Sequence, residues 1–101
     1  MRLLAFLSIT AITACTQAEN EFVVKDQQRR VERATLVLCG SKTPLRRRGD
    51  QLAVSKVVQC EDDGRIELRY SSGDEHECVV GYVTPGAVQN FAFRATDNGC
   101  A

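Results

Sequence analysis

The chain is short, with 101 residues, and its 13 lysines and arginines balance its 13 aspartates and glutamates. A single domain of this size buries too little apolar surface to be comfortably stable on its core alone, so covalent cross-links are a physical need. The charge balance hides an asymmetry. Residues 25–56 carry nine basic and three acidic side chains, whereas residues 57–101 carry three basic and eight acidic. One interpretation is that the opposite charges of the two segments simply compensate each other on a solvated surface. Alternatively, the basic segment offers a positive patch to an acidic partner.

The first 18 residues are typical of a secretory signal peptide. Arg2 supplies the positive start, and residues 3–14 (LLAFLSITAITA) form an apolar stretch that is too short to span a bilayer. Small residues precede a cleavage point after Ala18. An alternative is that residues 12–15 (ITAC) act as a bacterial lipobox, which would make Cys15 a lipidated first residue. We expect secretion to the extracellular space, with a bacterial outer-membrane lipoprotein as the alternative. A membrane is expected only if Cys15 is lipidated.

Residues 19–33 (ENEFVVKDQQRRVER) are polar and show no clear apolar face. They predict a flexible arm rather than part of the folded domain. The pair Arg29-Arg30 could be a dibasic processing site. In that case the arm would be a propeptide and the mature domain would begin near Val31, although a charged linker explains the pair equally well.

Residues 34–101 predict a disulfide-bonded β domain. The clearest strand covers residues 65–70 (RIELRY), where Ile66, Leu68 and Tyr70 share the face that should be buried. Residues 77–83 (ECVVGYV) are apolar on both faces, which predicts a central strand. Most of the connections are short enough for hairpins. We therefore expect an all-β fold, a small antiparallel five- to six-stranded sandwich or open barrel, with strands within residues 34–39, 51–60, 65–70, 77–83 and 88–95.

Two charged segments fall between these strands. Residues 40–49 predict a loop that contains Arg46, Arg47 and Arg48, the densest basic run and the candidate partner-binding site. This run has no interleaved aromatic residues, so nucleic acid is not an expected partner. Residues 61–64 (EDDG) are shorter than an EF-hand loop and predict a tight hairpin turn rather than a cation site.

Four cysteines remain after signal cleavage: Cys39, Cys60, Cys78 and Cys100. Outside the cytosol they should form two disulfides, and the residues alone leave all three connectivities open. No C-x-x-C motif is present, so the sequence predicts neither a typical cysteine zinc site nor a thioredoxin-like redox motif. His76 is the single histidine and lies in an acidic turn with no local nucleophile signature. The sequence therefore predicts no catalytic residue, metal ligand or cofactor.

The order of cysteines and strands in residues 39–100 resembles that of the MAX effectors of plant-pathogenic fungi, and within them the ToxB-like toxins. One cysteine ends LVLC, one precedes DDG and RIELRY, one opens CVVGYV and one ends NGC. The resemblance implies the pairing Cys39–Cys78 and Cys60–Cys100. It also implies a secreted, non-enzymatic, toxin-like effector that binds a host protein. The competing hypotheses are an inhibitor or immunity lipoprotein anchored at Cys15 and a small secreted enzyme.

Overall fold

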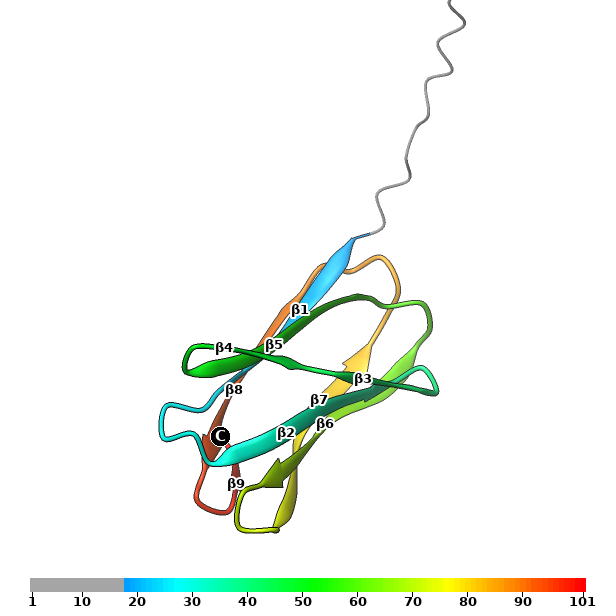
Figure 1. The fold of residues 1–101 in the computed structure, drawn as a ribbon. Coiled ribbons are helices and arrows are strands. Elements are labelled where there is room, and N and C mark those ends of the chain that lie inside the picture. The colour runs from blue at the N-terminus through cyan, green and yellow to red at the C-terminus, as the bar shows by residue number, and fades with distance from the viewer. Residues whose placement is uncertain (1–17) are drawn as a thin grey trace, which may run out of the picture.

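The computed structural model describes residues 18–101, which form two β-sheets packed around a common core (Figure 1). The predictions for the signal peptide and for lipidation of Cys15 fall on residues outside this range. No helix occurs in the described residues, and hence none that could cross a membrane. The prediction of a small all-β sandwich with two disulfides is confirmed.

Residues 18–101 contain nine short strands rather than five or six. One sheet has the order β4-β5-β1-β8-β9 and the other has the order β3-β2-β6-β7. All neighbouring strands run antiparallel except β1 and β8, which are parallel. The strands are β1 (Glu19–Lys25), β2 (Val31–Leu38), β3 (Ser41–Pro44), β4 (Arg46–Arg48), β5 (Gln51–Val57), β6 (Asp62–Tyr70), β7 (Glu75–Val83), β8 (Asn90–Thr96) and β9 (Gly99–Cys100).

The flexible arm predicted for residues 19–33 is wrong, because residues 19–25 form β1 in the middle of the five-stranded sheet. Phe22 and Val24 are fully buried, and they alternate with side chains on the outer face. Their partner strands β5 and β8 lie far away in the sequence, so local pattern alone could not reveal them. The folded domain therefore begins at β1 rather than at residue 34. Removal of a propeptide up to Arg30 would delete this strand.

The loop predicted for residues 40–49 is also wrong, because residues 41–48 cross from one sheet to the other. Strand β3 pairs with β2, Leu45 enters the core, and β4 pairs with β5. Proline and arginine are poor residues for a central strand. However, β3 and β4 each lie at the end of a sheet, where such residues are tolerated.

Strand β6 confirms the predicted inner face. Ile66, Leu68 and Tyr70 are each at most 4% exposed and belong to the core. The predicted hairpin turn at residues 61–64 is wrong, because residues 62–64 already belong to this strand. A Cβ atom on Gly64 would lie 3.0 Å from Cδ1 of Leu38. Glycine is thus used here for close packing rather than for a turn.

The buried Tyr70 joins the two sheets through its hydroxyl group. Its Oη lies 2.8 Å from the carbonyl oxygen of Thr96 and 2.7 Å from that of Gly99, near the β8–β9 turn. Burial raises the pKa of the Tyr70 phenol above its ordinary value. The hydroxyl therefore stays protonated and donates to these carbonyls.

Replacing Tyr70 by phenylalanine should lower the free energy of unfolding by about 1 to 2 kcal/mol, because two carbonyl oxygens lose their shared donor in a largely buried place. Urea unfolding followed by circular dichroism measures the change. Tyr82→Phe is the matched control, because Tyr82 is 60% exposed and its hydroxyl contacts only the exposed Glu61. Equal losses in the two variants would contradict this role of Tyr70.

Strand β7 is an edge strand, which corrects the prediction that it is central. A bulge explains why its sequence is apolar on both faces. Gly64 pairs with Gly81 and Arg65 pairs with Val79, so Val80 is an extra residue that shifts the alternation. Cys78 and Val83 consequently face the core, whereas Val79 and Tyr82 face solvent.

The disulfides join Cys39 to Cys60 and Cys78 to Cys100, so the pairing implied by the resemblance is wrong. Antiparallel pairing of β2 with β6 brings Cys60, just before β6, next to Cys39, just after β2. The second bridge links β7 of one sheet to β9 of the other. The sequence separations are 21 and 22 residues, for which the chain-entropy model predicts about 3 kcal/mol per bridge. Two such bridges are typical of an oxidising compartment.

Candidate binding site

The three arginines predicted to bind a partner lie on β4, but they do not act as one group. Arg46 and Arg48 are exposed on the outer face of the sheet, whereas Arg47 points to the other side and its side chain is 28% exposed. Alternation along the strand causes this split, since successive side chains point to opposite faces. Only Arg46 and Arg48 are therefore exposed to a partner.

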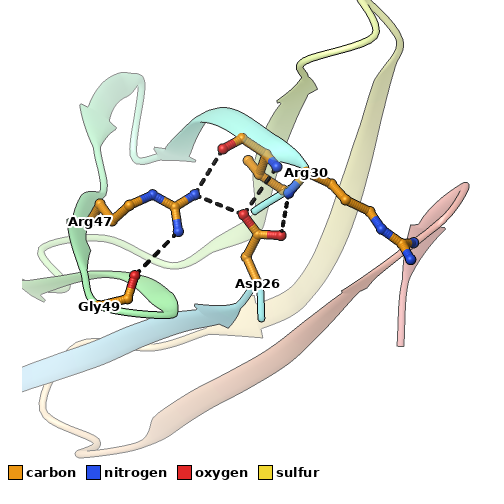
Figure 2. Close-up of polar contacts among 5 residues, drawn as sticks. Asp26, Arg30, Arg47 and Gly49 are labelled. Carbon is orange, nitrogen blue, oxygen red and sulfur yellow. Dashed lines mark hydrogen bonds and ion pairs between the residues drawn. The ribbon is translucent and has the colours of Figure 1, made fainter. Parts of the chain in front are cut away.

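Arg47 instead holds together the turn that follows β1 (Figure 2). Its Nη2 atom donates to Oδ2 of Asp26 at 2.7 Å and to the carbonyl oxygen of Val31 at 2.9 Å. The Asp26 carboxylate also accepts from the backbone amides of Arg30, at 2.8 Å, and Val31, at 3.0 Å. One carboxylate thus joins the turn between β1 and β2 to β4.

The Asp26 side chain is 1% exposed and remains ionised. Burial by itself would raise the pKa of this carboxyl. The hydrogen bonds from Arg47, Val31 and Arg30, together with the charge of Arg47, outweigh burial and hold the pKa below its ordinary value of 3.8. The sequence alone did not indicate this residue, because an aspartate between two polar residues, Lys25 and Gln27, carries no signal of burial. A strand assigned to residues 19–25 would have placed Asp26 at its end.

The most unusual exposed surface is the β7 edge, which we define as residues 75–83. Val79 is 72% exposed and Tyr82 is 60% exposed, and both project from the outer face of the sheet. Strand β7 is hydrogen-bonded to another strand only on its β6 side, so half of its backbone groups point away from β6. At Cys78 the disulfide holds β9 close to β7, with the Cα atoms of Cys78 and Cys100 5.2 Å apart. Exposed edge strands with apolar side chains are a liability in an isolated protein.

Acidic side chains surround the β7 edge. Tyr82 donates to Oε1 of Glu61 at 2.9 Å, and this hydrogen bond is the main reason that its pKa is raised. Glu75 and Glu77 lie on β7 itself and form long ion pairs with Arg69, at 3.9 Å, and Arg65, at 3.6 Å. Strand β7 has no lysine or arginine of its own. The β7 edge therefore combines an apolar centre with a negative border.

Two other clusters have structural explanations. Ligand atoms of Cys39, Cys60 and Asp62 lie within 4.8 Å of one another, but both sulfurs are in a disulfide and Asp62 accepts the amide hydrogen of Cys39. That contact supports Cys39 in a left-handed backbone conformation, with φ at 53°. His76 is half-buried, and its ring meets Tyr70 edge to face at 5.1 Å.

No protein-family model, curated protein sequence or solved structure matches this chain. The surfaces of the molecule are therefore the guide to its function.

Proposed function

We propose that this chain is a secreted, non-enzymatic binding protein of the effector or toxin-like kind, which acts by contacting a protein of its host. The β7 edge carries the proposal. It combines unpaired backbone groups, two strongly exposed apolar side chains and a negative border. The two disulfides and the signal-like residues 1–18 support secretion.

The partner proposed for the β7 edge is an extended segment of another protein that adds as a further strand. In this mode main-chain hydrogen bonds supply affinity, and alternate side chains supply specificity. A segment with an apolar residue to cover Val79 and lysines or arginines near Glu75 and Glu77 fits the charge of the edge. The bulge at Val80 limits the regular pairing to the first half of β7, around residues 75–79.

The test is selection of ligands from a library of random 12-residue peptides on the folded, oxidised protein. The expected ligands are basic and extended, and they should slow hydrogen exchange of the amides in residues 75–79. A lysine in place of Val79 should weaken their binding at least tenfold, because lysine on an edge opposes strand addition.

Val88→Lys is the matched control, because Val88 is 65% exposed but lies outside the β7 edge. Its ligands should bind as they do to the unmodified protein. Ligands that tolerate Val79→Lys, or that protect amides elsewhere, would contradict the proposed edge. Failure to select any ligand would also count against it.

A further inference from the structure

The outer face of the five-stranded sheet carries a row of cations that runs across its strands. Strand register places Arg48 opposite Gln51, Gln51 opposite Lys25, and Lys25 opposite Arg94. The side chains of Arg48, Lys25 and Arg94 are exposed. Since neighbouring strands lie about 4.8 Å apart, Lys25 is about 5 Å from Arg94 and about 10 Å from Arg48 along this row. We call these three residues the cationic row.

The cationic row concentrates positive charge without forming ion pairs. None of its members forms an ion pair with a carboxylate of residues 18–101. Of the nearby carboxylates, those of Asp26 and Asp97 are already paired, with Arg47 and Arg30, whereas Asp50 in the β4–β5 turn is exposed and forms no ion pair. Like charges directly opposite each other destabilise a sheet. The sheet therefore bears an electrostatic cost that an external anion would remove.

The outer face of the four-stranded sheet gives the opposite picture. There, Arg65 contacts both Glu67 and Glu77, Lys42 contacts Glu67, and Arg69 contacts Glu75. Several cations on that face thus have an acidic partner, although Arg33 lies opposite Arg69 in register and forms no ion pair. The cationic row differs in that none of its three members has an acidic partner.

The surroundings of the cationic row indicate the kind of anion. The next row across the sheet consists of the small side chains of Ala53, Val23 and Ala92 and of the exposed Arg46, a further cation. Lys25 and Arg94 also border a hollow of about 230 Å³, but the carboxylates of Asp26 and Asp97 line it too, so the hollow itself is not an anion site. Several anionic groups along one chain could instead lie along the exposed row.

Other polyanions fit this face less well. The phenylalanines of β1 and β8 belong to the core or pack against it, and Phe22 stacks on Phe91 with ring centroids 5.0 Å apart. No aromatic residue occupies the outer positions in register with the cationic row or the next row, so bases would have no platform for stacking. These outer positions also hold no large apolar side chain that would enter a lipid interface.

We propose that the cationic row binds a linear acidic polysaccharide bearing sulfate or carboxylate groups. This inference goes beyond the proposed function, because it concerns a different surface and a different class of ligand. Binding of this kind would hold the protein on an extracellular matrix or cell wall. The β7 edge belongs to the other sheet, so its test gives an independent result.

The experiment measures binding to immobilised heparin, a sulfated polysaccharide, at about 0.15 M salt. The triple variant Lys25→Gln, Arg48→Gln, Arg94→Gln should bind at least tenfold more weakly than the unmodified protein. It should also melt at the same or a higher temperature, because repulsion along the row is removed. The control variant Arg33→Gln, Lys42→Gln, Arg69→Gln removes equal charge from the other sheet and should change the affinity less than threefold.

Three results would overturn the proposal. The first is absence of binding to heparin by the unmodified protein. The second is an equal loss of affinity in both triple variants, which would reduce the effect to net charge. The third is tighter binding, dependent on the cationic row, to single-stranded DNA or to phosphatidylserine vesicles than to heparin.

Discussion

Replacing Arg47 by methionine should lower the free energy of unfolding by about 3 kcal/mol. Methionine keeps the apolar stem but leaves the buried Asp26 carboxylate without its charged partner and the Val31 carbonyl without its side-chain donor. Removing one partner of a buried ion pair is costly because the other charge stays desolvated. Urea unfolding at neutral pH with the disulfides intact measures this loss.

Arg46→Met and Arg48→Met are matched controls on the same strand. Their side chains are exposed and form no ion pair within the described residues, so both changes should leave stability nearly unchanged. A similar loss in all three variants would show that the strand itself, rather than the contact with Asp26, is sensitive to substitution.

The same ion pair should make stability depend on acid. The pKa of Asp26 is lower in the folded protein than its ordinary value of 3.8, so the unfolded chain binds the proton first as the pH falls. The stabilisation is complete at pH values above the ordinary value and is lost as the pH falls through the folded value. In Asp26→Asn this part of the dependence should disappear, and unfolding midpoints at pH 7 and pH 3 should differ less than in the unmodified protein.

A chain that begins at Val31 should not fold, even with its four cysteines oxidised. It lacks β1, which lies between β5 and β8 and contributes the fully buried Phe22 and Val24. Without β1 the two strands lose their common partner, and the core loses two apolar side chains worth about 1.5 to 3 kcal/mol each in burial alone. Such a loss is comparable to the whole stability of a small domain.

A chain that begins at Glu19 is the control, since it keeps all of β1 and corresponds to cleavage after Ala18. It should show a strand-rich circular dichroism spectrum and a cooperative thermal transition. The shorter chain should show neither, and its amide protons should exchange at unprotected rates. A cooperative transition in the shorter chain would mean that β1 is dispensable and that processing after Arg30 remains compatible with folding.

Local pattern was sufficient for much of the fold. Alternation in residues 65–70 correctly placed Ile66, Leu68 and Tyr70 in the core. Successive side chains of a strand point to opposite faces, so every second residue of a half-buried strand faces the core. The number of cysteines and the small size predicted two disulfides, and strand-forming segments with short connections predicted an all-β sandwich. These features depend on residues close together in the sequence.

Tertiary contacts decided the rest. The polar segment around Phe22 becomes a central strand only because β5 and β8 supply its neighbours. The disulfide pairing follows from which strand ends the sheets bring together. Arg47 is structural and Arg48 is exposed because one side of β4 faces Asp26. The cationic row exists only across strands, since register places Lys25 next to Arg94, 69 positions further along the chain. No local sequence pattern predicts which residues of different strands lie side by side, because strand pairing decides this and not the residues within each strand.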